Sequence, residues 1–205
     1  MAVHEIRRFE NSERFWHITG AATFIVLAVS GLGLYARELS WLTVLTGGPY
    51  LSKWVHFLAG LVFALCQVMN FLQWRRDCSG WTEADGDWLR KSGGYLWSTH
   101  DDVPEQGRFN TGQKLMFWST SLESLGLFAT GIVLWVPFVF PKGIASLSLL
   151  LHAFFGVTLI MLIVIHVYLA TAANPGTFRA MWTGRVSAGW ARYHHARWWK
   201  DVSRP

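Results

Sequence analysis

The chain has 205 residues, of which 52% are hydrophobic, 16% are aromatic and only 15% are charged, with a formal net charge of +5. Soluble domains usually carry about a quarter charged residues, and the charges here stand in blocks between long uncharged runs, as in a membrane protein. The basic excess lies beside these runs and is therefore not a nucleic-acid signal. The two cysteines, Cys66 and Cys78, form no CxxC motif, so the chain brings no ligand set for an iron–sulfur cluster or a structural zinc.

Four apolar runs are each long enough to cross about 30 Å of hydrocarbon as an α-helix. Tryptophans lie near their ends, as an aromatic belt at the membrane surface requires. The first run is longer than the apolar core of a signal peptide and shows no convincing cleavage site, so we expect it to remain in the protein. The predicted spans are residues 15–35, 54–74, 115–135 and 147–173.

Cap and turn signals mark the ends of these runs. Asn11 or Ser12 can cap the first helix. Gly47-Gly48-Pro49 predicts a turn before the second span, and Asn174-Pro175-Gly176 is expected to end the fourth.

The remaining segments are predicted to be connections of three kinds. Residues 75–113 form one long hydrophilic loop, 137–143 a tight return, and the basic, Trp-rich tail 177–205 an interfacial or soluble helix. Since nothing resembles a linker or an internal repeat, we expect one domain over residues 1–205. The fold class is an all-α membrane protein, a four-transmembrane-helix bundle with a cytoplasmic loop and a C-terminal tail.

The distribution of Lys and Arg predicts the orientation. Of the 18 basic residues, only Arg37, Lys53 and Lys142 fall on one side of the predicted spans, and the other 15 fall on the opposite side. Positively charged loops face the cytoplasm in membrane proteins. Both termini and the long loop are therefore expected in the cytoplasm.

Two histidines in the fourth span, His152 and His166, are the first sign of a metal centre. Fourteen residues on an α-helix make nearly four turns, so both imidazoles leave the same face, about 21 Å apart along the axis. Gly156 on that face leaves a gap where a flat ligand could approach the backbone. A buried intramembrane histidine needs a partner, and iron is a suitable one. A core histidine bonded to a neighbouring helix is the alternative for each.

Histidines in the first two spans complete two couples at matching depths. With the predicted orientation, His56 lies with His152 near the outer face, and His17 with His166 near the cytoplasmic face. Each couple comes from two helices, which is what six-coordinate haem needs in a bundle core. Four unrelated core histidines are the competing interpretation. The other histidines lie outside the spans and are expected to be solvated: His4, His100, His194 and His195.

Beyond the four histidines, two further segments carry a resemblance to a known family. These are Arg108-Phe109-Asn110-Thr111-Gly112-Gln113-Lys114, and Gly184-Arg185-Val186-Ser187 followed by Trp190-Ala191 and His194-His195. With them the chain resembles, nearly end to end, the cytochrome b (γ) subunit of membrane-bound, quinone-linked formate dehydrogenases. The histidine spacing alone would also fit the cytochrome b subunit of a hydrogenase or a thiosulfate reductase.

The resemblance implies a membrane anchor and electron carrier with two haem b groups, and no catalytic residue for formate. Electrons would pass from an external iron–sulfur (β) subunit, fed by a molybdenum or tungsten catalytic (α) subunit, to a quinone near the cytoplasmic face. Asn110 and Gly112 match the family's quinone pocket, and helix capping is the alternative role of Asn110. The implied location is the bacterial cytoplasmic membrane, in a higher oligomer of heterotrimers.

Glu123, inside the third span, departs from the apolar character expected in that family. An ionised carboxylate facing lipid costs several kcal/mol, so this residue should face the bundle or be protonated. Its expected partners are nearby hydroxyls such as Ser119 and Thr130, a partner's transmembrane segment, or a haem propionate's hydrogen-bond network. A function from another class, a haem-free four-span metal transporter, would use the same histidines for a metal ion.

Overall fold

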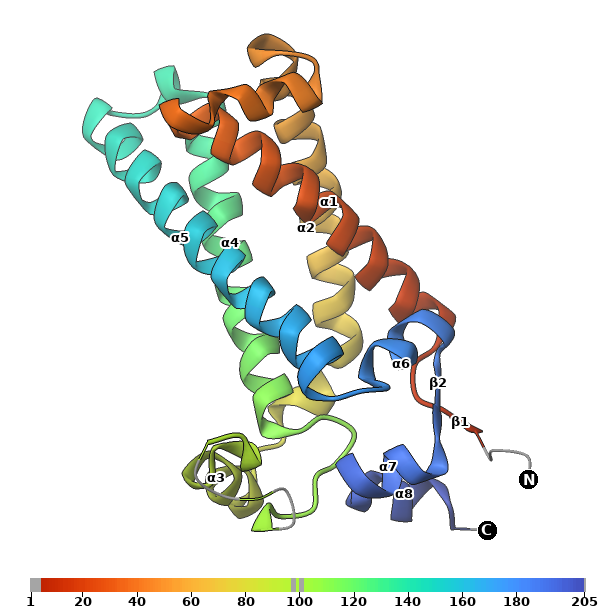
Figure 1. Cartoon of the computed structure of the whole chain (residues 1–205). Coiled ribbons are helices and arrows are strands. Elements are labelled where there is room, and N and C mark those ends of the chain that lie inside the picture. Colours follow the sequence, from red (N-terminus) through yellow and green to blue (C-terminus); the bar gives the residue numbers. More distant parts are fainter. Residues whose placement is uncertain (1–4, 97–98, 100–101, 205) are drawn as a thin grey trace. The chain divides into compact units, whose positions relative to one another are not determined.

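Four long apolar helices dominate the computed structural model, which describes residues 5–96, 99 and 102–204 (Figure 1). All four are long and apolar enough to cross a membrane, which confirms the predicted all-α, four-span class. They are α1 (Asn11–Tyr35), α2 (Pro49–Ser79), α4 (Thr111–Trp135) and α5 (Lys142–Tyr168), the last continuing as a π-helical turn, η5 (Leu169–Ala173). Each helix reaches beyond its predicted run, because polar residues continue the backbone hydrogen bonding past the apolar segment.

The start of α1 differs from the predicted cap. Asn11 already belongs to the helix, and its side-chain oxygen accepts a hydrogen bond from Arg14. The carboxylate of Glu13 accepts from the backbone N–H of Glu10 at 2.7 Å, as the acidic partner of a capping box does. The capping side chain is therefore that of Glu13, the third residue of the helix, and not that of Asn11 or Ser12.

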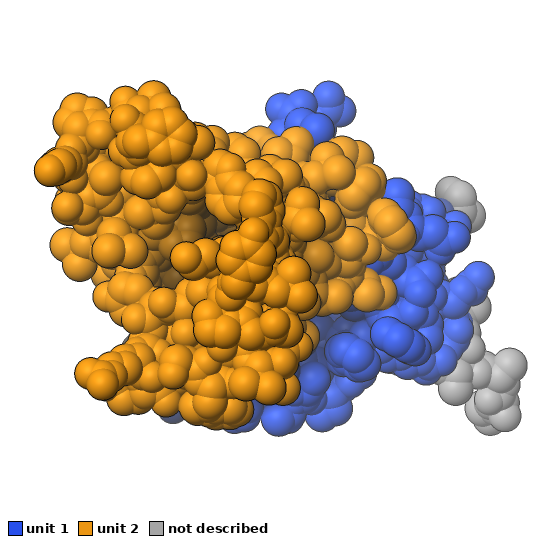
Figure 2. All heavy atoms as spheres, turned by 90° about the horizontal axis from the view of Figure 1, so that it is seen from above, with its two compact units in different colours: residues 1–14, 72–119, 166–205 blue, residues 15–71, 120–165 orange. Residues whose placement is uncertain are grey.

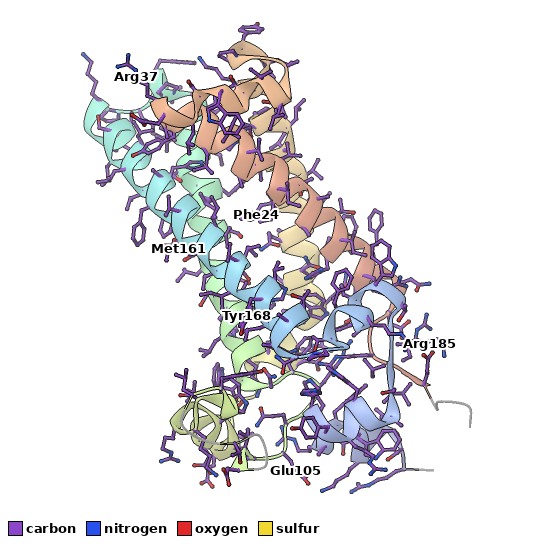
Figure 3. All side chains as sticks on the ribbon, in the orientation of Figure 1. Phe24, Arg37, Glu105, Met161, Tyr168 and Arg185 are labelled. Atoms are coloured by element: carbon purple, nitrogen blue, oxygen red, sulfur yellow. The ribbon has the colours of Figure 1, made fainter. Side chains whose placement is uncertain are left out.

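The chain forms two compact units, coloured separately in Figure 2. Unit 1 comprises Met1–Arg14, Leu72–Ser119 and His166–Pro205, and unit 2 comprises Phe15–Phe71 and Thr120–Ile165. Unit 2 holds the apolar parts of α1, α2, α4 and α5. Many of its large apolar side chains are exposed, for example that of Met161 on α5, which is 60% exposed (Figure 3). Outward apolar surface on every helix is what lipid contact requires.

Short connections close one end of unit 2. A 3-10 helix, η1 (Arg37–Thr46), follows α1, and Gly47 and Gly48 then turn the chain with φ of 87° and 94°. Glycine is needed there because other residues rarely adopt such angles. The predicted turn at Gly47-Gly48-Pro49 is thus confirmed. The return between α4 and α5 is a short 3-10 helix, η4 (Pro137–Val139).

Unit 1 is more structured than the predicted loop and tail. The region expected as one loop contains α3 (Glu83–Arg90) and the 3-10 turn η2 (Ser92–Gly94). The tail contains α6 (Thr177–Thr183), α7 (Ala188–His194) and α8 (Ala196–Val202) instead of one helix. Strand β1 (Glu5–Arg7) pairs antiparallel with β2 (Arg185–Ser187), with Ile6 opposite Val186. These strands are too short for an alternating pattern to stand out in the sequence.

A buried arginine joins the three segments of unit 1. Arg8 is 3% exposed and donates to the carbonyl of Arg108 at 2.7 Å. Its guanidinium lies over the rings of Phe9, Trp190 and Trp198, 4.8–5.3 Å from their centroids. Burial, helped by the charge of Arg108, lowers the pKa of Arg8 to about 9. The N-terminal arm, the loop before α4 and the tail are thus held around one cation.

His195 is part of this cluster, so the expectation that it is solvated is wrong. It is 1% exposed, and its Nδ1 lies 2.6 Å from the carbonyl of Gly107. A carbonyl only accepts, so Nδ1 carries the proton and Nε2 accepts from Arg8 at 3.0 Å. His194 is half-buried beside Trp190 and Tyr193. His4 and His100 lie outside the described residues.

Candidate haem site

His56 on α2 and His152 on α5 face each other inside unit 2. Their ring centroids are 6.2 Å apart and their planes are inclined at 65°. Two imidazoles that ligate one metal ion from opposite sides stand about 6 Å apart between centroids, because each ligating nitrogen lies about 2 Å from the metal. The predicted couple of His56 and His152 therefore has the spacing of a shared iron.

Hydroxyl groups on the two other helices fix the tautomer of both rings. Ser30 on α1 places its oxygen 2.9 Å from Nδ1 of His56, and Thr130 on α4 places its oxygen 2.9 Å from Nδ1 of His152. Each hydroxyl also lies within donor distance of the backbone carbonyl four residues earlier, at 2.6 Å and 2.7 Å. Since a carbonyl only accepts, the hydroxyl proton is used there and Nδ1–H must donate. Nε2 of each ring then keeps its lone pair for a metal.

Glycines shape the space around these rings. A Cβ on Gly31 would meet Cε1 of His56 at 3.0 Å, and one on Gly131 would meet Cε1 of His152 at 3.4 Å. Gly156 has open space where a side chain would be, as its expected role beside a flat ligand requires. Figure 2 shows unit 2 hollowed near the centre of the face in view. The donor set, its spacing and this room fit a haem held between His56 and His152.

Gly20, by contrast, does not leave room for a cofactor. A Cβ there would lie 3.3 Å from the Cβ of Cys66, so Gly20 lets α1 and α2 pack closely. Gly60, four residues after His56 on α2, is more open, because a Cβ there would meet only Leu27, at 3.9 Å. Among the described residues, Cys66 and Cys78 are both buried thiols and form no disulfide.

The second predicted couple, His17 and His166, is divided between the units. His17 lies on α1 in unit 2, and His166 lies near the end of α5 in unit 1. Both are half-buried. Their pairing around an iron stays a prediction.

Asn110 caps α4, as the alternative interpretation proposed. Its side-chain oxygen accepts from the N–H of Gln113 at 2.9 Å, and the side chain of Gln113 accepts from the N–H of Asn110 at 3.0 Å. This reciprocal pair is a capping box. Thr111, the rival cap, is buried and donates instead to Asp85 at 2.8 Å.

Asn110 also lines a pocket in unit 1, of about 240 Å³. The pocket lies among α3, the loop before α4, and α7, with Trp88, Tyr95 and His194 in its wall. Gly112 lies against Trp88, because a Cβ there would come within 2.9 Å of the indole. Asn110 is therefore both a helix cap and a polar group on a pocket wall. Gly112 has no side chain and so leaves the space that the indole of Trp88 occupies.

A buried ion pair holds α3 against the start of α4. Lys114 and Asp85 are both 4% exposed at their side chains, and Nζ lies 2.8 Å from Oδ1. Burial pushes the pKa of Asp85 upward, but hydrogen bonds from Lys114, Thr111 and Thr82 outweigh it and hold the pKa below its usual range. Asp85 therefore stays ionised at neutral pH, and the pair holds α3, which carries Trp88, against the start of α4.

Glu123 has its contact inside the chain. Its side chain is half-buried and lies near Thr158 on α5, so it faces the bundle as expected, and its Oε2 is buried without a hydrogen-bond partner. Ser124, next to it, accepts from the side-chain amide of Gln67 on α2 at 3.0 Å.

The sequence analysis did not identify Ser30 and Thr130 as contacts of the histidines. The available signal was a hydroxyl residue followed by glycine in two apolar spans.

Fold and site together define a membrane cytochrome of b type. A family model described as prokaryotic cytochrome b561 matches residues 8–184, and the chain belongs to this family. The match implies haem b and a role in electron transfer, and it favours these over a haem-free transporter.

Individual similar proteins indicate the subfamily more closely than the family match does. The chain is 33% identical over 203 residues to the formate dehydrogenase cytochrome b556(fdo) subunit of Escherichia coli K12, covering 97% of this chain and 94% of that protein. It is 31% identical over 195 residues to the nitrate-inducible cytochrome b556(Fdn) subunit, covering 94% and 89%. A Haemophilus influenzae formate dehydrogenase subunit is 26% identical over 200 residues, covering 96% and 83%. The predicted resemblance to cytochrome b subunits of formate dehydrogenases is confirmed.

Proposed function

We propose that this chain anchors a respiratory formate dehydrogenase in the bacterial cytoplasmic membrane and conducts its electrons to a quinone. It holds two haem b groups, one between His56 and His152 and one between His17 and His166. A bound haem supplies reversible one-electron iron chemistry. Electrons enter at the outer couple, pass to the inner couple and reduce the quinone near the cytoplasmic face.

The arrangement of His56 and His152 carries this proposal. Two neutral imidazoles whose Nε2 atoms remain available as ligands, at a centroid spacing of 6.2 Å, meet the requirement of a six-coordinate iron. If the hydroxyls only stabilised two separate buried histidines, the two rings would have no reason to face each other. Their facing arrangement therefore favours a shared iron.

The charges of the two units support the orientation. Unit 2 contains Arg37, Lys53 and Lys142, and unit 1 contains the other 15 of the 18 basic residues. By the positive-inside rule, unit 1, with both termini, is the cytoplasmic part. The opposite side then receives electrons from an iron–sulfur (β) subunit, which a molybdenum or tungsten (α) subunit supplies. Heterotrimers of these chains assemble into a higher oligomer.

The pocket beside Asn110 supports a quinone site in unit 1. An amide side chain donates to a quinone carbonyl, and the ring of Trp88 offers an apolar wall. Because the oxygen of Asn110 is used by the helix cap, its NH₂ group is the part available to a ligand. Reduction there takes protons from the cytoplasm while formate oxidation releases them outside, which builds a proton gradient without a pump.

The haem content of the purified complex tests the proposal. A pyridine haemochrome assay should give two haem b per copy of this chain. His56→Ala and His152→Ala should each remove the same haem, and His17→Ala and His166→Ala should each remove the other. One haem in the unaltered complex, or loss of different haems from His56→Ala and His152→Ala, contradicts the ligand assignment.

A further inference from the structure

The surroundings of His56 and His152 repeat the same local arrangement on two different helices. On α1, Ser30 bonds Nδ1 of His56 and the next residue, Gly31, lies against its Cε1. On α4, Thr130 bonds Nδ1 of His152 and Gly131 lies against its Cε1. The two hydroxyls also lie 3.4 Å and 3.2 Å from the carbonyls three residues earlier, those of Leu27 and Leu127. Each histidine therefore lies against a Ser/Thr-Gly pair of the preceding helix.

Both hydroxyls are removed from solvent. Ser30 is 0% exposed and Thr130 is 8% exposed. Each accepts from an imidazole N–H while donating to a backbone carbonyl, and such chains polarise the oxygen in the middle. An N–H that donates to a polarised acceptor makes the imidazole a stronger electron donor at Nε2. Stronger donation stabilises ferric over ferrous iron and lowers the reduction potential.

We propose that Ser30-Gly31 and Thr130-Gly131 are positioning residues that set the ring orientation and donor strength of His56 and His152, and thereby the potential of one haem. This inference rests on the proposed function, in which the two histidines share an iron. A lower potential suits the haem at which electrons enter, because the transfer to the second couple then runs downhill. Both hydroxyls must act on the same haem.

The competing explanation is that these hydroxyls only bond their own helix. Ser and Thr in membrane helices often donate to the carbonyl four residues earlier, without further function. Thr23 on α1 provides the matched control, since it donates to the carbonyls of Thr19 and Gly20 at 2.9 Å and 3.0 Å. Removing its hydroxyl changes the helix in the same way as at Ser30 and leaves both histidines untouched.

Redox titration of the purified complex, with optical detection of both haems, tests the proposal. Ser30→Ala and Thr130→Val should retain two haems and raise the potential of the same one. The expected shift is about tenfold in its ferric-to-ferrous ratio, or ~59 mV. The low-spin ferric EPR signal of that haem should shift as well. Ser30→Thr, Thr130→Ser and Thr23→Val should match the unaltered complex.

The outcomes separate this inference from the proposed function. Two haems with unmoved potentials and EPR signals in both Ser30→Ala and Thr130→Val would overturn the inference and leave the proposed function standing. Shifts in two different haems would overturn both. If Ser30→Ala loses the haem outright, retention of it in Ser30→Thr supports the hydroxyl's role, and its loss in Ser30→Thr overturns that role.

Discussion

The two units of the chain satisfy their buried polar groups in opposite ways. In unit 2 a polar side chain bonds its own helix and one neighbour, as Ser30 does with Val26 and His56. In unit 1 polar groups form networks across distant segments, as Arg108 does with Glu13, Asp77 and the carbonyl of Arg8. A lipid-facing bundle favours short, neutral contacts, because an unpaired charge there is costly. Unit 1 instead contains buried full charges, each with a partner in another segment.

The largest effect is expected from breaking the buried pair of unit 1. Asp85→Asn removes the counter-ion of Lys114 in a site that is 4% exposed and leaves it the carbonyl of Gly80 as a partner, which costs about 3–5 kcal/mol. Thermal denaturation of the complex in detergent should show a clear loss of stability. Asp87→Asn, whose partner Arg90 is 76% exposed at its side chain, is the control and should have little effect.

The pH dependence of this pair follows from the depressed pKa of Asp85. A carboxyl with a lowered folded pKa stabilises the protein fully above its unfolded value of about 3.9. That stabilisation is lost as the pH falls through the folded pKa. Below that point the unaltered chain and Asp85→Asn should converge in stability. A stability difference that stays constant down to pH 2 would contradict the ion-pair account.

The next largest effect on stability is expected from replacing a glycine at a helix contact in unit 2. Gly126→Ala would place a Cβ 2.6 Å from the ring of Phe155, so α4 and α5 must separate, at about 1–3 kcal/mol. Gly156→Ala meets open space, and alanine is the better helix former. Denaturation of the haem-free chain should therefore rank Gly126→Ala below the unaltered chain and Gly156→Ala at or above it. In the haem-loaded complex, Gly156→Ala should instead weaken haem retention.

Substitutions at Asn110 and Gln113 distinguish helix capping from quinone binding. Asn110→Ala removes the cap, at about 1 kcal/mol, together with the amide on the pocket wall. Gln113→Ala removes only the reciprocal half of the cap. We expect Asn110→Ala to slow quinone reduction severalfold while both haems remain reducible by the donor subunits, and Gln113→Ala to leave turnover near normal. Equal losses in the two variants would assign Asn110 to the cap alone.

The smallest effect is expected at Glu123. Glu123→Gln keeps the shape and the hydrogen-bonding capacity of the side chain near Thr158, so assembly and most turnover should persist. Steady-state quinone reduction and haem content measure this. Loss of quinone reduction with the complex and both haems intact would show that Glu123 carries protons.

The sequence by itself determined the four spans and the pairing of His56 with His152. Uncharged runs of membrane length leave the backbone no alternative to a helix in lipid, and helical periodicity then sets the face and depth of each histidine. Charge counts along the chain predicted the orientation for the same reason, since they depend only on the order of segments. The family resemblance, which comparison with known proteins confirms, rested on short motifs that are likewise local.

Only the tertiary structure decided what lies around those histidines and in unit 1. Ser30 and Thr130 are ordinary span residues until α2 and α5 bring imidazoles to their hydroxyls. The sequence predicts a solvated His195 and gives no sign that Arg8 is buried, because the burial of both depends on contacts between distant segments, such as their own contact across 187 positions of the chain. Such contacts leave no periodic signal in the sequence. Charges buried by networks, and hydroxyls that orient ligands, therefore emerge only when the helices and the tail are packed.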